Sequence, residues 1–287
     1  MNKIAIAFIS CDRPEYFKQV LETVEKQTLS FNNFDVYLFQ DLTNQKEKVD
    51  ECVALFTKTF PSGNIVLRKE NINVAMNYYL ANKQLFFEND YTHIVYFADD
   101  MILSSYYLET LMMLIDKLGN DERIGAISCS GEGMLNSLEV QETNQHKLTF
   151  MGRMWGFCWT KAAYEKILPR LDEYLNKFII GKDYRKRDNN GIRQWLRLNN
   201  FKNIVTSQDG VIDCALVEQN LIKISCFPGM IKHIGENGLH NNPGSYRNYR
   251  FGEQILYDKR IESIEDLTDE KCAELLRLFK SRFLIKF

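Results

Sequence analysis

The chain has 287 residues, 45% of them apolar and 26% charged, which allows a sizeable hydrophobic core and excludes a disordered or low-complexity protein. Its formal net charge of −2 excludes the overall basic field that attracts nucleic acid to a protein. No run approaches the roughly 20 apolar residues of a membrane span, the N-terminus lacks a signal-peptide cleavage site, and the seven cysteines form no CxxC pair, so we expect a cytoplasmic protein.

The first half of the chain alternates short apolar runs with segments of helical spacing. Five runs predict strands, over residues 3–10, 34–41, 64–70, 93–100 and 124–130. Four helices are expected between them: one that opens at Pro14 and ends in Gln27, two over 44–59 and 73–87, and one capped by Ser104. Strands that alternate with helices in this way indicate an α/β fold with a mostly parallel sheet.

The second half is less regular. It contains an aromatic strand or loop that becomes a helix, a charged loop before a short helix, a glycine-rich loop, and a terminal helix, over 151–168, 181–200, 228–244 and 266–287. We therefore expect an α/β half over residues 1–130, a second half of the same domain over 131–250, and a helical tail over 251–287.

Polar and charged residues follow the predicted strands at the points where three of them end. These ends read SCDRP, FQD and FADD. Ligands of open α/β sheets bind outside the carboxyl ends of the strands. We therefore expect Asp41 and the pair Asp99 and Asp100 to share one site.

Asp99 and Asp100 directly follow a strand that reads as buried core. A buried carboxylate is costly unless something positive meets it. A lysine or arginine from elsewhere, a helix N-terminus or a metal ion can supply that charge, and Mg²⁺ or Mn²⁺ prefers such oxygen ligands. The structural alternative is a salt-bridged pair, or a turn in which Asp100 caps the next helix.

These features together resemble a known family. An apolar first strand, S-x-x-R-P at the start of a helix, Asp41 after the second strand and A-D-D after the fourth resemble the GT-A nucleotide-sugar glycosyltransferases, of the inverting, family-2-like bacterial type. The resemblance is good over residues 3–130 and looser over 150–240. It implies a Rossmann-like, mostly parallel sheet with helices on both faces, a smaller mixed acceptor region and a C-terminal helix.

The resemblance also implies roles for residues at the first strand ends. A nucleotide-diphosphate sugar would lie over them, in contact with Ser10 and Arg13 of the S-x-x-R-P motif. A-D-D stands where the family has D-x-D or E-D-D. It would make Asp100 the direct ligand of Mn²⁺ or Mg²⁺, and would place Asp99 against the sugar or ribose and near the same metal. Asp41 would bind the base edge, and its structural alternative is a turn that caps the next helix.

Two further segments are implied to touch the donor. Asn73 and Asn77 lie in a segment that resembles N-x-G-x-x-x-x-N, and capping is the alternative for Asn73. Trp155 and Gly156 resemble the family's G-x-x-W segment beneath donor and acceptor. The neighbouring aromatic residues alternate as in a strand, so we expect at least two of the three to pack in the core.

A catalytic base and a late metal ligand are implied for the second half. The base would be an aspartate just before a helix, which favours Asp188 over Asp183, although Asp188 can equally be the N-cap of that helix. His233, in the glycine-rich loop, would complete the metal shell or touch the diphosphate. His240 is the weaker second choice.

The tail alternates cationic and bulky apolar side chains. This pattern suits peripheral contact with the inner face of an anionic membrane, and the alternative is a helix that docks on its own domain. The basic members are Arg277, Lys280, Arg282 and Lys286, and the apolar members are Leu278, Phe279, Phe283, Leu284 and Phe287.

The expected activity is a metal-dependent hexosyl or N-acetylhexosaminyl transfer. The donor would be a nucleotide-diphosphate sugar, UDP being the expected nucleotide, and the acceptor a hydroxyl of a glycan, glycoprotein, glycopeptide or lipid-linked molecule. One alternative is a non-catalytic sugar-nucleotide-binding or scaffold protein of the same fold. Another is a nucleotidyltransferase, which the absence of glycine in SCDRPEYF disfavours. A dehydrogenase is disfavoured because no G-x-G-x-x-G follows the first strand.

Overall fold

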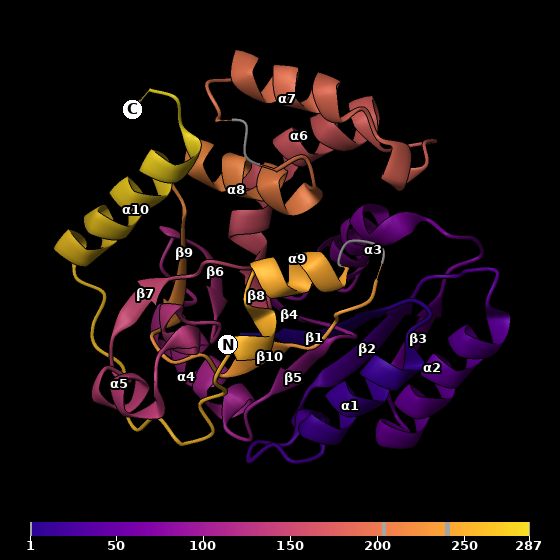
Figure 1. Cartoon of the computed structure of the whole chain (residues 1–287), viewed down its shortest axis with the longest axis horizontal. Helices are drawn as coiled ribbons and strands as arrows, with labels where there is room; N and C mark the ends of the chain where they lie inside the picture. The colour runs from indigo at the N-terminus through magenta and orange to yellow at the C-terminus, as the bar shows by residue number, and fades with distance from the viewer. Residues whose placement is uncertain (1, 203–204, 239–241, 287) are drawn as a thin grey trace.

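A mixed β-sheet forms the centre of the computed structural model, which describes residues 2–202, 205–238 and 242–286 (Figure 1). In this part of the chain the sheet has eight strands in the order β3-β2-β1-β4-β8-β6-β9-β7. Their bounds are β1 Ile4–Ser10, β2 Asp35–Gln40, β3 Asn64–Leu67, β4 His93–Ala98, β6 Ile124–Ser128, β7 Leu148–Phe150, β8 Phe157–Thr160 and β9 Ile222–Cys226. A separate antiparallel pair is formed by β5 (Met101–Leu103) and β10 (Ile231–His233).

The first half of the sheet is parallel. β1 pairs in parallel with both β2 and β4, and β2 pairs in parallel with β3. Every residue of β1 after Ile4 is buried, because helices cover the sheet. These helices are α1 Pro14–Val24, α2 Lys46–Thr59, α3 Asn73–Asn82 with a π-helical continuation Lys83–Glu88, and α4 Tyr107–Leu118. The predicted α/β class is confirmed.

The second half continues the same sheet. β8 runs antiparallel between β4 and β6, β9 is parallel to β6, and β7 is antiparallel to β9. The helices of this half are α5 Leu138–Thr143, α6 Lys161–Phe178, α7 Asn189–Leu198, α8 Gln208–Glu218, α9 Pro243–Asn248 and α10 Asp269–Phe283. Short 3₁₀ turns are η1 Phe31–Asn33, η3 Glu132–Leu135, η4 Tyr184–Lys186 and η5 Phe251–Glu253. The sequence-based boundary at residue 130 therefore falls inside one sheet.

The predicted cap of α4 is wrong. The helix begins at Tyr107, with Tyr106 at the N-cap position. Ser104 is fully buried, and its hydroxyl donates instead to the Asp258 carboxylate at 3.0 Å. The three residues of β5 take up the space before the helix, because their backbone pairs with β10.

The C-terminal helix docks on its own domain. α10 contacts α8, β9 and the edge strand β7. Phe279 and Phe283 are buried, and the ring of Phe279 lies 5.1 Å from that of Phe150. These aromatic side chains are therefore covered by protein. In the described residues, no helix is both long enough and apolar enough to span a bilayer.

Candidate functional site

The candidate site lies where the strand order reverses. The chain runs outward from β1 to β2 and β3, then returns to place β4 on the other side of β1. Such a switch point leaves a space at the carboxyl ends of the two central strands. The Asp41 N–H donates to the Ser10 carbonyl at 2.9 Å, and the N–H of Cys11, just after β1, donates to the Asp99 carboxylate at 3.4 Å. The ends of β1, β2 and β4 therefore do bring these aspartates near one another.

An arginine meets the acidic pair. Asp99 and Asp100 are both buried, and the Arg13 guanidinium bridges them, with Nη2 donating to Asp99 and Nη1 donating to Asp100 at 2.8 Å. Asp99 also accepts the Ser10 hydroxyl and the Cys11 backbone N–H, at 3.5 and 3.4 Å. Pro14 fixes Arg13 here by starting α1 immediately after it. The positive charge that the sequence requires thus comes, at least in part, from within the S-x-x-R-P motif.

The pKa values of the two carboxylates are shifted in opposite directions. Burial and the charge of Asp100 raise the pKa of Asp99, although Arg13 opposes this rise. Burial also acts against the charge of Asp100, but Arg13 and His233 outweigh it and lower the pKa of Asp100 to about 2. Asp100 therefore stays ionised throughout the ordinary pH range.

His233 belongs to the same cluster. Its Nε2 lies 3.4 Å from Asp100 Oδ2, because the β5–β10 pairing sets His233 opposite Met101. The His233 ring stacks on Trp155 at 5.2 Å between centroids. A Cβ at Gly235 would collide with the Asp100 carboxylate, so the loop after β10 passes close to that oxygen only because residue 235 is glycine.

Trp155 and Gly156 occupy different positions from the two other aromatic residues of their segment. Phe157 and Trp159 are buried core residues of β8, whereas Trp155 is half-buried beside His233. Gly156 has φ of +49°, and a Cβ there would lie 2.6 Å from Tyr107 Oη. Glycine is thus required at the bend that turns Trp155 toward the site.

Arg153 is a cation next to this cluster. Its guanidinium lies 5.3, 5.0 and 4.8 Å from the rings of Trp155, Tyr249 and Phe251. Burial lowers the pKa of Arg153. The contacts within the described residues include no carboxylate for it, so aromatic faces alone compensate its charge.

A second polar group surrounds Asp41 at the end of β2. Asp41 is buried, and its Oδ1 accepts the backbone N–H groups of Leu42 and Ile72, each at 3.0 Å. Burial nevertheless raises the pKa of Asp41, while Arg68 lowers it. Arg68 Nε donates to Asn77 Oδ1 at 2.9 Å, and its buried Nη2 has no hydrogen-bond partner in the described part of the chain.

The two predicted asparagines play different parts here. Asn77 is buried, and its side chain links Arg68 to the carbonyl of Phe39 at 3.0 Å. Asn73 has φ of +69°, and its side chain accepts the N–H of Met76 at 3.1 Å, which satisfies a donor in the first turn of α3. Asn77 thus positions Arg68, and Asn73 accepts a hydrogen bond within the first turn of α3; contact of either residue with a donor stays a prediction.

A divalent cation fits this site as a two-ligand centre. No group of three His, Cys, Asp or Glu side chains converges for metal binding within the described ranges. Asp100 Oδ2 and His233 Nε2 are close enough to face one ion, whose other ligands would be water and phosphate oxygens. Arg13 donates to the same Asp100 oxygen, so guanidinium and cation would share that carboxylate.

The two predicted bases both serve as helix caps. Asp188 accepts the N–H of Gly191 at 2.8 Å and caps α7, while Asp183 accepts the N–H of Arg185 at 3.0 Å and caps η4. No hydrogen bond joins either one to Asp41, Asp99 or Asp100 in the part of the chain that the structure describes. His240 lies outside the described residues.

A further carboxylate near the acidic pair, Asp209, went unpredicted. It lies in the first turn of α8 with an exposed side chain. Protein packed around it nevertheless raises the pKa of Asp209 to about 6, Asp213 raises it further and Lys223 lowers it. Burial also raises the pKa of Tyr78, and the charges of Asp209, Asp100 and Asp99 add to that rise. The charges of all three carboxylates therefore act on Tyr78.

Comparison with known proteins gives structural neighbours only. Neither a family model nor a curated protein matches the chain. The chain is similar to the mannosyltransferase PcManGT from Pyrobaculum calidifontis, solved with GDP-Man and Mn²⁺, at 14% identity and a TM-score of 0.45 over 79% of this chain and 56% of that one. It is also similar to TarS of S. aureus in complex with UDP, at 12% identity and a TM-score of 0.42 over 98% of this chain and 65% of that one. The chain thus spans less than two thirds of either protein, and a likeness of this degree assigns no activity.

Proposed function

We propose that the protein is a glycosyltransferase that moves a hexosyl or N-acetylhexosaminyl group from a nucleotide-diphosphate sugar to a hydroxyl. The observation that carries this proposal is the buried Asp99–Asp100 pair at the switch point, bound by Arg13 and His233. A fixed acidic pair beside cationic groups suits a ligand that is itself a diphosphate with a counter-ion. The site thus has groups for both the metal and the leaving group.

The polar group at the end of β2 suits a pyrimidine base such as uracil. A carboxylate accepts up to about four hydrogen bonds, so the two backbone donors on Asp41 leave capacity for a ring N–H. The unpartnered Nη2 of Arg68 can donate to a neighbouring carbonyl oxygen. Uracil presents such an N–H between two carbonyls, which is why UDP is the proposed nucleotide.

The proposed reaction is a displacement at the anomeric carbon. The acceptor oxygen bonds to that carbon, the bond from the carbon to the phosphate oxygen breaks, and the nucleoside diphosphate leaves with the electron pair. Arg13 donates toward the leaving group, and Asp100 and His233 would hold a divalent cation, which would supply further positive charge there.

The acceptor proton needs a base. We assign this role to Asp209, because it is exposed, its charge acts on Tyr78 as those of Asp99 and Asp100 do, and its pKa is raised to about 6. Asp188 and Asp183 stay the alternatives that the sequence favours. Attack from the face opposite the leaving group inverts the anomeric centre. The acceptor is a glycan, glycopeptide or lipid-linked hydroxyl.

The test is calorimetric titration with UDP- and GDP-linked hexoses and N-acetylhexosamines, with Mn²⁺ or with EDTA. We expect one donor to bind to the wild type in Mn²⁺, and affinity to fall at least about tenfold in EDTA or in Asp100→Ala. Asp50→Ala is the matched control, since Asp50 is exposed on α2. The control should bind as the wild type does.

Two outcomes would contradict the proposal. If no donor binds under any metal condition, the acidic pair is only a salt-bridged turn. If a donor binds but neither transfer nor slow donor hydrolysis follows, the chain is the non-catalytic sugar-nucleotide-binding protein that the sequence leaves open.

A further inference from the structure

Basic residues gather in two segments of a chain that is acidic overall. Residues 177–202 contain eight Lys or Arg against two Asp, and residues 277–286 contain four Lys or Arg and no acid. The whole chain has 36 basic and 38 acidic residues, so 24 basic and 36 acidic residues remain elsewhere. The near-zero net charge therefore hides a strong separation of charge.

The two basic segments lie side by side. Phe201 and Leu284 form an antiparallel bridge. The Lys202 N–H donates to the Phe283 carbonyl at 2.7 Å, and the Ile285 N–H donates to the Asn200 carbonyl at 2.9 Å. Figure 1 shows α7 and the end of α10 at the same end of the molecule. We call this surface the basic pole, defined by Lys182, Arg185, Lys186, Arg193, Arg197, Lys202 and Lys286.

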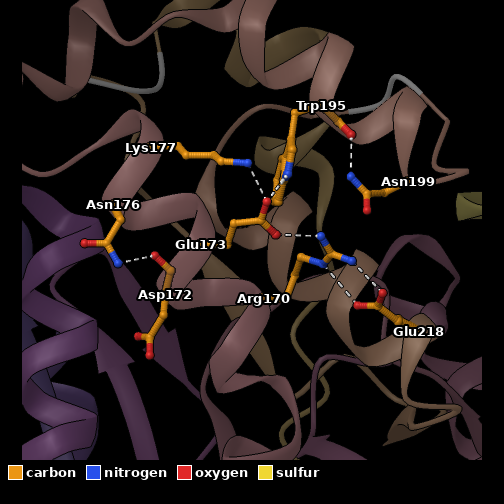
Figure 2. Close-up of polar contacts among 8 residues, drawn as sticks. All are labelled: Arg170, Asp172, Glu173, Asn176, Lys177, Trp195, Asn199 and Glu218. Carbon is orange, nitrogen blue, oxygen red and sulfur yellow. Dashed lines mark hydrogen bonds and ion pairs between the residues drawn. The ribbon is translucent and has the colours of Figure 1, made fainter.

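Large aliphatic side chains are exposed in the basic pole. Leu198 is 80% exposed at the end of α7, and Ile285 is 49% exposed on the strand segment beside it. The helix itself is firmly held: Trp195 is buried and its indole N–H donates to Glu173 at 2.8 Å (Figure 2). Leu198 is therefore exposed although its helix is well packed.

We propose that the basic pole docks the protein on an anionic membrane surface, with Leu198 and Ile285 entering the headgroup region. Clustered lysines and arginines attract anionic lipids, and aliphatic side chains among them add hydrophobic contact. Nucleic acid fits less well, because single strands need aromatic platforms and Trp195, Phe201 and Phe283 are all buried. This docking differs from contact through Phe279 and Phe283 of the tail, which the domain covers; Phe287 lies outside the described residues.

The experiment measures co-sedimentation of the full chain with vesicles of phosphatidylcholine alone or with 30% phosphatidylglycerol (about the anionic fraction of a cytoplasmic leaflet). One variant removes charge: Lys186→Gln, Arg193→Gln and Arg197→Gln. A second removes the aliphatic groups: Leu198→Ser with Ile285→Ser. The matched controls are Lys46→Gln, Lys48→Gln and Lys58→Gln on α2, and Ile65→Ser with Leu138→Ser, which are exposed to 40% and 44%.

We expect the wild type to sediment with anionic vesicles only. The charge variant should lose on the order of a hundredfold in vesicle affinity, the aliphatic variant about tenfold, and the controls less than about twofold. Absence of binding to anionic vesicles, or equal losses in the controls, would overturn the proposal. The proposal would also be overturned if the aliphatic variant bound anionic vesicles as tightly as the wild type and both proteins bound heparin equally well. The basic pole would then recognise any polyanion. None of these readouts uses a nucleotide sugar, so the result is independent of the proposed activity.

Discussion

Two carboxylates of this molecule have pKa values that are shifted in opposite directions. Asp100 is buried, but Arg13 and His233 contact it and its pKa is lowered to about 2. Burial raises the pKa of Asp209 to about 6, the charge of Asp213 adds to that rise, and Lys223, which is paired with Asp213 at 2.6 Å, only opposes it. Burial acts against the charge of both carboxylates, so the contacts with Arg13 and His233 are what keep Asp100 ionised. The first group suits binding of a charge, and the second suits transfer of a proton.

The strongest way to break this comparison is Asp209→Asn. If Asp209 accepts the acceptor proton, the turnover number should fall about 10²- to 10⁴-fold while donor affinity stays within twofold. Steady-state transfer rates and calorimetric titration measure the two effects. Asp188→Asn and Asp183→Asn are the matched controls, and each should change stability and rate little, because asparagine caps a helix about as well as aspartate does. A larger rate loss in Asp188→Asn would return the role of base to that residue.

Removal of Arg13, the cation that contacts Asp99 and Asp100, sharpens the comparison. Arg13→Ala leaves two buried carboxylates without their partner, which costs about 3–5 kcal/mol of unfolding free energy when such a pair is broken. A divalent cation can replace the lost charge. Mn²⁺ should therefore raise the melting temperature of Arg13→Ala more than that of the wild type, as measured by thermal unfolding in Mn²⁺ and in EDTA.

Arg277→Ala is the control for this experiment, because Arg277 is exposed on α10. Its melting temperature should match that of the wild type in both buffers. Equal Mn²⁺ shifts in Arg13→Ala and the wild type would show that no cation replaces the guanidinium.

The smallest expected effect is the change of the transfer rate with pH. Asp209 must be deprotonated to act as base, and its pKa is raised to about 6. The transfer rate should therefore be flat above about pH 7 and fall tenfold per unit below about pH 6, as the carboxylate takes up its proton. Asp100, with a pKa of about 2, stays ionised over this range and adds no step. A profile that is flat down to pH 4.5 would exclude Asp209 as the titrating group.

The first half of the fold was predictable because local patterns determine it. β1, β2, β3 and β4 all coincide with apolar runs, and their parallel pairing follows from the alternation with helices. The insertion of β8 between β4 and β6 was not predictable. It depends on pairing between residues about 30 to 65 positions apart, for which the strand FCWT itself carries no signal.

The candidate site was predictable to a similar extent. Asp99, Asp100, Arg13 and His233 were expected at one site, and their side chains converge there. Arg68 and Asp209 were missed. Each is a single charged residue in an ordinary strand or helix start, and only the tertiary structure shows the unpartnered Nη2 of the first and the raised pKa of the second. The serine-glutamine-aspartate sequence at the start of α8 signals a helix start and no more.

The position of α10 has a consequence for how the protein is made. The helix packs on the edge strand β7, but it follows every strand in the chain. A ribosome therefore completes the sheet before it completes the helix that covers this edge, and during that interval Phe150 and the unpaired backbone of β7 face solvent. We expect the yield of correctly folded protein to fall when translation is slowed before α10 has left the ribosome.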